Sequence, residues 1–219
     1  MINSTDYKKY LKSNKVDSRY LKQYQSKSSE YLSDNLNLGL QNDVFAKLLN
    51  ERIIFLTGDI EDYNCDLIKA NLLYLEQLDD EKDIKLYINS GGGSVYSGLG
   101  LLDTMEYVKP DIVTINTGLA ASMAAVLLCS GTKGKRKGLR RSRTMIHQPL
   151  AGFGGYLQAS DLEIDAREIN SLKKELHTII SECTGRDYQK VEKDSDRDYW
   201  MTADEALKYG MIDDIIRKK

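Results

Sequence analysis

Residues 112–125 read Ile-Val-Thr-Ile-Asn-Thr-Gly-Leu-Ala-Ala-Ser-Met-Ala-Ala, and this stretch decides the fold. The β-branched residues at 112–115 predict a buried strand, and the small residues after Gly118 predict a helix that contains Ser122. Ser122 would then lie at or near a helix amino terminus, where backbone N–H groups and the helix dipole favour a developing negative charge. The stretch therefore predicts a strand-to-helix unit with a serine at its turn.

The same alternation of strand and helix continues on both sides of this stretch. Short units in this order predict an α/β fold with a parallel sheet and right-handed crossovers. Further strands are expected at 52–57, where Gly58 would end the strand, and at 84–88, 143–146 and 211–216. Apolar periodicity predicts helices around 44–49, 67–78, 99–105, 160–184 and 202–210.

The longest predicted helix, at 160–184, begins with a capping box at Ser160 and ends at Gly185. Because it follows the sheet strands, we expect it to project from the globule and to bury its apolar stripe against another subunit. A second capping box, at Thr202, predicts the start of the next short helix. The apolar stripe of the long helix consists of Leu162, Ala166, Ile169, Leu172, Leu176, Ile179 and Cys183.

The first 36 residues are rich in Lys, Ser, Tyr, Asn and Asp and poor in branched aliphatic residues. Such a segment buries too little apolar surface to offset the entropy lost on ordering. We therefore divide the chain into a polar amino-terminal extension or propeptide at 1–36 and one folded domain at 37–219. A length of 219 residues with 41% hydrophobic residues suffices for one core.

Charge and composition exclude several classes of function. A net charge of −2 disfavours binding to nucleic acid or to an anionic membrane. The sequence has no long apolar run and no secretory signal, so we expect a soluble, cytoplasmic protein. The cysteines Cys65, Cys129 and Cys183 lack CxxC spacing, which favours free thiols in a reducing compartment over disulfides or a zinc site. No metal or cofactor is expected.

Ser122, His147 and a cluster of aspartates supply the residue types of nucleophilic catalysis. A serine becomes a nucleophile when an imidazole takes its proton and a carboxylate fixes the tautomer of that imidazole. Of the two histidines, His147 ends a predicted strand, whereas His177 lies in a helical pattern as a surface or packing residue. The order Ser, His, Asp differs from the orders in α/β-hydrolases, chymotrypsin and subtilisin. Spacing leaves three candidates for the orienting carboxylate, Asp194, Asp196 and Asp198.

A glycine-rich turn is predicted at 90–93, between a strand and a helix. It lacks the GxGxxG spacing and the Gly-Lys-Ser/Thr ending of phosphate-binding loops. Because glycine lets the backbone approach a ligand closely, the Gly93 N–H is a candidate donor to an oxyanion, beside the N–H of Met123. Two such converging amides would form an oxyanion hole.

Four segments resemble the signatures of the Clp protease proteolytic subunit family, the caseinolytic serine peptidases. They occur in order and with compatible spacing, and the resemblance runs from about Asp43 to Ile216. Four separate motifs make the resemblance specific. The segments are Tyr-Ile-Asn-Ser-Gly-Gly-Gly (87–93), Gly-Leu-Ala-Ala-Ser-Met-Ala-Ala (118–125), Met-Ile-His-Gln-Pro (145–149) and Asp-Ser-Asp-Arg-Asp-Tyr-Trp-Met-Thr (194–202).

The resemblance implies a serine endopeptidase that hydrolyses peptide bonds in unfolded polypeptides without a metal or cofactor of its own. It implies Ser122 as the nucleophile, His147 as the general base and then acid, and Asp198 as the orienting carboxylate. The oxyanion amides would be those of Gly93 and Met123. It further implies a crotonase-like spiral of ββα units, two stacked heptameric rings joined by the long helix as a protruding handle, and a hexameric AAA+ ATPase that threads substrates in.

The sequence also departs from the family pattern. Gly91 stands where the family usually has proline, which gives the oxyanion loop more conformational freedom. Lys85 and Lys137 occupy positions where the family commonly places aromatic residues, in the apical pocket that receives the unfoldase. The loop between His147 and Ser160 is longer than the usual pattern, and it lies where substrate would run.

Two other functions fit parts of the sequence. A weakly active or scaffold subunit, assembled with a paralogous subunit in a mixed ring, would account for Gly91, Lys85 and Lys137. A crotonase-type acyl-CoA enzyme would share the fold and the paired-amide oxyanion hole, but its chemistry does not require the serine, histidine and aspartate set. Asp196 and Arg197 match positions that contribute to contacts between rings in the family.

Overall fold

The structure, a computed structural model, describes residues 39–150 and 158–217 of the chain. The extension predicted at 1–36 lies outside the described residues. The same holds for residues 151–157, which form most of the loop between His147 and the long helix.

The chain divides into two compact units, Met1–Leu48 and Leu49–Lys219. The described part of the first unit belongs to helix α3 (Gly39–Asn50), which confirms the short helix predicted around 44–49. The predicted domain boundary between residues 36 and 37 stays a prediction. All further elements belong to the second unit.

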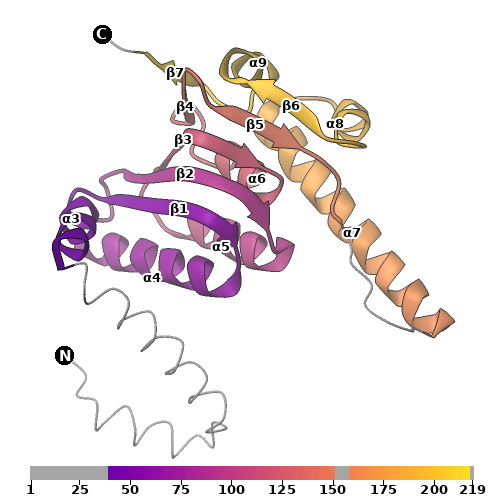
Figure 1. The fold of residues 1–219 in the computed structure, drawn as a ribbon, viewed down its shortest axis with the longest axis horizontal. Helices are drawn as coiled ribbons and strands as arrows, with labels where there is room; N and C mark the ends of the chain where they lie inside the picture. The colour runs from indigo at the N-terminus through magenta and orange to yellow at the C-terminus, as the bar shows by residue number, and fades with distance from the viewer. Residues whose placement is uncertain (1–38, 151–157, 218–219) are drawn as a thin grey trace, which may run out of the picture. The chain divides into compact units, whose positions relative to one another are not determined.

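Seven strands form one sheet in the described part of the second unit (Figure 1). Their order is β1-β2-β3-β4-β7, with β5 paired to β3 and β6 paired to β5. Neighbouring strands are parallel except β5 and β6, which are antiparallel, so the predicted parallel α/β sheet is confirmed. The strands are β1 (Ile53–Ile60), β2 (Ile84–Gly93), β3 (Ile112–Ala121), β4 (Lys137–Leu139), β5 (Arg143–Ile146), β6 (Tyr199–Thr202) and β7 (Asp214–Ile216).

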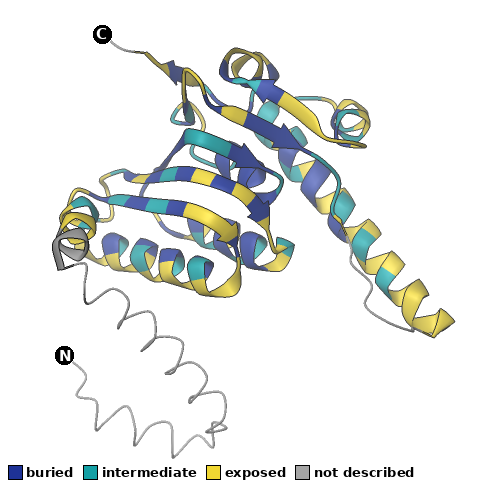
Figure 2. Ribbon diagram, viewed as in Figure 1, coloured by how far each residue is buried: buried dark blue, intermediate teal, exposed yellow. Residues whose placement is uncertain are grey.

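The helices bury one face of the central strands. Helix α4 packs on β1, α6 packs on β2 and β3, and α5 contacts both of these helices. Residues alternate across the sheet, so Ile54 and Leu56 of β1 are buried under the helices whereas Phe55 between them is only half-buried (Figure 2). The helices are α4 (Asp62–Leu78), α5 (Val95–Tyr107), α6 (Met123–Cys129), α7 (Ala159–Thr184), α8 (Tyr188–Asp194) and α9 (Ala203–Tyr209).

Two strands continue through glycines that were expected to end them. Strand β1 passes Gly58, which has φ +75° and lies at a register shift between Thr57 and Asp59. Strand β2 runs through the predicted turn at 90–93, and its Gly93 pairs with Ile60. Both expected ends were wrong because a glycine with positive φ also permits a bulge inside a paired strand.

Helix α7 is long, as predicted, but it begins differently. Its N-cap is Gln158, without a side-chain cap, so the capping box expected at Ser160 was wrong. Its end at Gly185, in the left-handed conformation with φ +69°, is confirmed. Only the carboxyl-terminal half is buried in this chain, while the first half extends beyond the sheet with Leu162 and Ile164 exposed (Figures 1 and 2).

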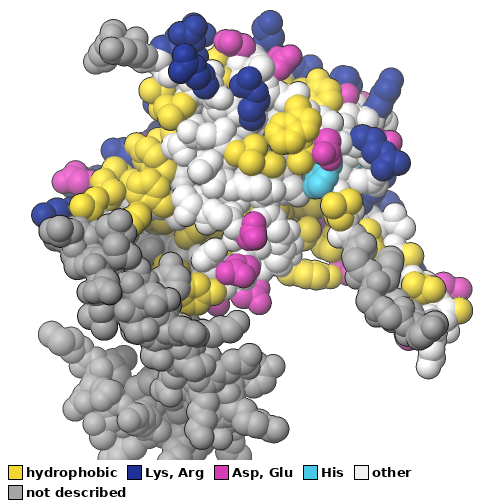
Figure 3. Space-filling model, in the orientation of Figure 1, with side chains coloured by type: hydrophobic (Ala, Val, Ile, Leu, Met, Phe, Trp, Pro, Cys, Tyr) yellow, Lys and Arg dark blue, Asp and Glu magenta, His cyan; other side chains and the backbone are white. Residues whose placement is uncertain are grey.

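The carboxyl-terminal strands complete the sheet, with β7 beside β4 and β6 beside β5. The capping box between Thr202 and Glu205 is present at the start of α9, which ends at Gly210 as predicted. The last strand begins at Asp214 and not at Met211, because the Met211 N–H still donates to Ala206 O of α9 at 2.9 Å and pairing with β4 starts only at Asp214. Lys and Arg side chains gather over β4, β7 and α9 (Figure 3). In the described ranges, no helix is long and apolar enough to cross a membrane.

Candidate active site

Ser122 lies at the turn between β3 and α6, where the sequence predicts it. It is the N-cap residue of α6 and has φ +55° and ψ −128°, a conformation that costs a non-glycine residue about 1–3 kcal/mol. Two backbone hydrogen bonds hold the turn: Ser122 N–H donates to Met145 O at 2.9 Å, and Ala125 N–H donates to Ser122 O at 2.9 Å. The residues of α6 are all buried, so the turn is fixed against a rigid element.

His147 follows directly after β5 and faces Ser122. Strand β5 pairs with β3 in parallel, with Met145 opposite Ala121, so both strands end at the same edge of the sheet. This pairing places His147 Nε2 2.8 Å from Ser122 Oγ. The His147 side chain is only 15% exposed. The structure therefore brings together the two residues that the sequence proposed as base and nucleophile.

Asp198 is the aspartate of the cluster that contacts this imidazole. Its Oδ1 lies 3.1 Å from His147 Nδ1, on the side of the ring opposite the serine. Asp194 instead accepts hydrogen bonds from Lys190 Nζ at 2.7 Å and from the Tyr209 hydroxyl at 3.0 Å. The geometry thus distinguishes two candidates that spacing left open.

Asp196, the third candidate, contacts Gln148. Its backbone carbonyl and its Oδ1 both accept from Gln148 Nε2, at 2.8 and 3.4 Å. The same segment is tied down by Gln148 N–H, which donates to Ser195 O at 2.6 Å. Asp196 therefore anchors the backbone next to His147 without facing the imidazole in these contacts.

The predicted oxyanion donors, Gly93 and Met123, line the cavity onto which Ser122 and His147 open. A Cβ atom at position 93 would lie 2.2 Å from Ile60 O, so only glycine fits there. At this position strand β2 therefore lies directly against the backbone of β1. Gly93 and Met123 thus border the same cavity as the Ser122 hydroxyl, and they remain the candidate donors to an oxyanion.

An apolar wall completes the cavity, whose volume is about 120 Å³. Val126 of α6 and Ile146 of β5 contribute to this wall, and Leu176 and Ile180 reach it from α7. The sequence predicted Leu176 and Ile179 for an interface stripe and missed this role. Ile180, 2% exposed, is the fully buried residue, whereas Ile179 is only partly buried. The wall suits an apolar side chain of a bound peptide.

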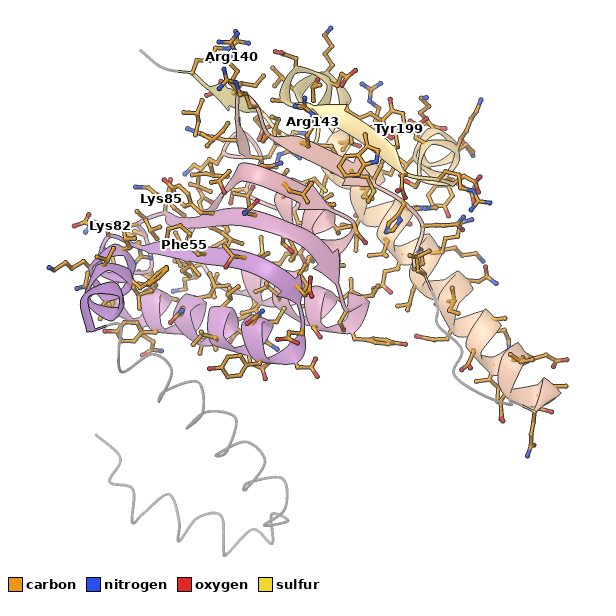
Figure 4. The ribbon with its side chains drawn as sticks, viewed as in Figure 1. Phe55, Lys82, Lys85, Arg140, Arg143 and Tyr199 are labelled. Carbon is orange, nitrogen blue, oxygen red and sulfur yellow. The ribbon has the colours of Figure 1, made fainter. Side chains whose placement is uncertain are left out.

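The residues at which the sequence departs from the family pattern lie on or near the surface. A Cβ at Gly91 would meet no atom within 4 Å. Lys85 is exposed on β2, and Phe55 and Tyr87 lie nearby with their ring centroids 5.5 Å apart (Figure 4). Lys137 is half-buried on β4. Within residues 39–150 and 158–217, no group of three or more His, Cys, Asp or Glu residues could hold a metal ion.

Comparison with known proteins identifies the family. The family model described as Clp protease matches residues 38–219. The ATP-dependent Clp protease proteolytic subunit of Porphyromonas gingivalis is 54% identical over 220 residues, covering 97% of this chain and 98% of the relative. The subunit of the same name from Bacteroides fragilis is 59% identical over 179 residues, covering 82% of this chain and 86% of the relative.

A third relative has a similar degree of identity. The ATP-dependent Clp protease proteolytic subunit 1 of Prochlorococcus marinus is 55% identical over 177 residues, covering 81% of this chain and 90% of the relative. Identity of this extent across nearly the whole length of several relatives leaves no other family in contention. This chain belongs to the Clp protease family and is a serine-type peptidase.

Proposed function

We propose that this peptidase hydrolyses peptide bonds in unfolded polypeptides through an acyl-enzyme on Ser122. One observation carries the assignment of roles: the contacts Ser122 Oγ–His147 Nε2 at 2.8 Å and His147 Nδ1–Asp198 Oδ1 at 3.1 Å form an unbroken relay. The imidazole takes the serine proton as Oγ attacks the peptide carbonyl. Asp198 fixes the tautomer of His147 and stabilises the imidazolium that forms.

The amides of Gly93 and Met123 would stabilise the oxyanion of the tetrahedral intermediate. His147 then protonates the departing amine, which leaves with the carboxyl-terminal part of the substrate. A water molecule, activated by the same imidazole, attacks the acyl-enzyme and releases the second product. No step uses a metal or a cofactor. The apolar cavity would receive the side chain that precedes the scissile bond.

We further propose that the chain is the proteolytic subunit of an ATP-dependent Clp protease, as its relatives are named. The assembly would be two stacked heptameric rings, fed by a hexameric AAA+ ATPase, in the cytoplasm. The fold would be the crotonase-like spiral of ββα units, with α7 as its handle. The exposed apolar residues Leu162 and Ile164 on the first half of α7 support this role, since burial in a neighbouring chain would remove them from water.

Fluorophosphonate labelling, combined with size-exclusion chromatography, tests this proposal. We expect one label per chain, mapped by mass spectrometry to Ser122, in a ring-sized species. Ser122→Ala should lose the label and peptide hydrolysis while keeping its elution volume. Ser195→Ala is the matched control, because that buried hydroxyl has no hydrogen-bond partner among the described residues and lies outside the relay.

Each contrary outcome points to a different error. Labelling at another serine would contradict the assignment of Ser122. An assembled but unlabelled protein would favour a scaffold subunit that works with an active paralogue. Thermal protection by a CoA thioester would instead favour the acyl-CoA enzyme. A labelled monomer would retain the catalytic assignment and contradict the ring assembly.

A further inference from the structure

Two cysteines from distant parts of the chain converge on one arginine. Cys129 is the last residue of α6, and Cys183 lies in the last turn of α7. The same nitrogen, Arg136 Nη1, donates hydrogen bonds to the backbone carbonyls of both, to Cys129 O at 3.0 Å and to Cys183 O at 2.8 Å. The guanidinium is 1% exposed and pairs with Asp213 at 2.6 Å. This fixed cation holds the backbones of the two cysteines side by side.

The side chains meet as well. Cys183 Sγ lies 3.8 Å from the hydroxyl of Ser130, the residue after Cys129. The Ser130 hydroxyl in turn donates to Val126 O at 2.8 Å. Cys129 Sγ also lies 3.2 Å from Val126 O, and Cys129 is fully buried whereas Cys183 is half-buried. The pair therefore combines a partly exposed thiol, that of Cys183, with a buried one, that of Cys129.

The surroundings of the two thiols shift their pKa values in opposite directions. The neighbouring Cys129 side chain, aided by the Ser130 hydroxyl and the Arg136 cation, lowers the pKa of Cys183 below that of an ordinary thiol, although burial opposes this shift. The neighbouring Cys183 side chain and burial raise the pKa of Cys129. A thiolate attacks disulfides far faster than a thiol does, so Cys183 is the nucleophile of the pair.

Cys65 provides a contrast within the same chain. It is buried in α4 with 0% exposure, and burial raises the pKa of its thiol. Neither Cys129 nor Cys183 lies in that helix. A reagent that distinguishes thiols by access and charge should therefore spare Cys65.

We propose that Cys129 and Cys183 are a reversible modification site, which reacts with small-molecule disulfides and closes to an intramolecular disulfide between α6 and α7. The Cys183 thiolate attacks one sulfur of the reagent, a mixed disulfide forms, and one small thiol departs. Cys129 then gives up its proton and attacks Cys183 Sγ, which expels the second small thiol. The two cysteines lose two electrons, the reagent gains them, and the two cysteine protons end on the departing thiols.

The bond would join two helices that both serve the active site. Helix α6 carries Ser122 at its amino terminus, and α7 supplies Leu176 and Ile180 to the apolar wall of the cavity. Closing the 129–183 bond restricts the unfolded chain and the relative movement of the two helices. Oxidation should therefore raise the thermal unfolding midpoint and leave a state that excess thiol reverses.

The test exposes the assembled protein to glutathione disulfide, blocks remaining thiols with N-ethylmaleimide, and maps the peptides without reduction. We expect a linked Cys129–Cys183 peptide, with Cys65 fully alkylated, and return of all three thiols after dithiothreitol. Cys129→Ser should stop at a mixed disulfide on Cys183, because the second attack is lost. Cys183→Ser should not react, and Cys65→Ser, the control, should behave as the unchanged protein does.

Three results would overturn the proposal. One is a mixed disulfide on Cys183 that persists in the unchanged protein, since Cys129 would then not reach it. Another is a disulfide between two chains, visible as a dimer on a non-reducing gel. The third is equal reactivity of Cys65 and Cys183, which would remove the distinction on which the site rests. None of these results depends on peptidase activity, so the assignment of Ser122 is tested separately.

Discussion

The backbone of Gly92 lies so close to Ser122 that a Cβ atom at position 92 would be 2.7 Å from Ser122 Cβ. Gly92 also has φ +100°, which side-chain-bearing residues rarely adopt. Gly92→Ala should therefore displace the serine turn and lower kcat roughly 10²-fold or more. Steady-state hydrolysis of a fluorogenic peptide measures this loss.

Gly91→Ala is the matched control for that change. A Cβ at Gly91 meets nothing within 4 Å, and its φ lies outside the left-handed region. Alanine there should keep full activity and stabilise the fold by about 0.4–1 kcal/mol, because it restricts the unfolded chain. Equal loss of activity in both variants would mean that the loop, and not the contact with Ser122, is what matters.

Asp198→Asn should retain the fold and lower kcat by roughly 10²–10⁴-fold, because an amide cannot stabilise the imidazolium of His147. Asp196→Asn is the comparison, since this residue contacts Gln148. Its effect on kcat should be much smaller at equal assembly. Rates measured on the same size-exclusion fraction separate catalysis from assembly. A larger loss in Asp196→Asn would reverse the two roles.

The apolar wall of the cavity predicts a cleavage preference. Among the described residues that line the cavity, none besides His147 can carry a charge that would pair with a substrate side chain. A peptide with leucine before the scissile bond should exceed its aspartate counterpart in kcat/KM by about 10-fold or more, because an unpaired carboxylate loses its hydration there. A panel of peptides that differ only at this residue measures the ratio. Equal values would show that the side chain binds elsewhere.

His177 predicts a dependence of stability on pH. Its ring is 1% exposed, it packs edge-on against Tyr188, and neither ring nitrogen has a hydrogen-bond partner in the described part of the chain. Burial, followed by the Lys173 charge, lowers the pKa of His177, while Glu192 on α8 opposes this shift. The folded state therefore resists a proton that the unfolded chain accepts below about pH 6.5.

The free energy of unfolding should accordingly fall as the pH drops below this value. His177→Phe should flatten the dependence, because phenylalanine preserves the ring contact with Tyr188 and takes up no proton. Thermal unfolding midpoints at pH 5.5 and 7.5 provide the comparison for both proteins. A steeper dependence in the variant would show that other groups dominate the titration.

Local sequence patterns were sufficient to predict most helices and strands, but glycines led to wrong predictions of where two strands end. The β-branched run at 112–115 and Gly185 marked a strand and a helix end correctly. Gly58 and the residues at 90–93 were read as strand ends, although they continue β1 and β2. A positive φ is compatible with a turn or with a bulge, and only the pairing with a neighbouring strand decides between them.

In the candidate site, too, local patterns predicted some features, whereas others depend on how the strands pair. Motif and strand position proposed Ser122 and His147, which the structure places in contact, whereas spacing could not select among three aspartates. The selection comes from the antiparallel pairing of β5 and β6, in which Ile146 lies opposite Tyr199. This register places the residue before Tyr199 across from the residue after Ile146. Long-range pairing of this kind is invisible to local periodicity.

The buried ion pair of Arg136 and Asp213 joins residues 77 positions apart. During biosynthesis, at about 5–20 residues per second, roughly 4–15 s pass between their additions to the chain. Throughout that interval the guanidinium lacks its carboxylate, and burying it unpaired would be costly. We therefore expect the core at the carboxyl-terminal end of α6 to close only after Asp213 has been synthesised, so that the peptidase becomes competent late in the synthesis of its own chain.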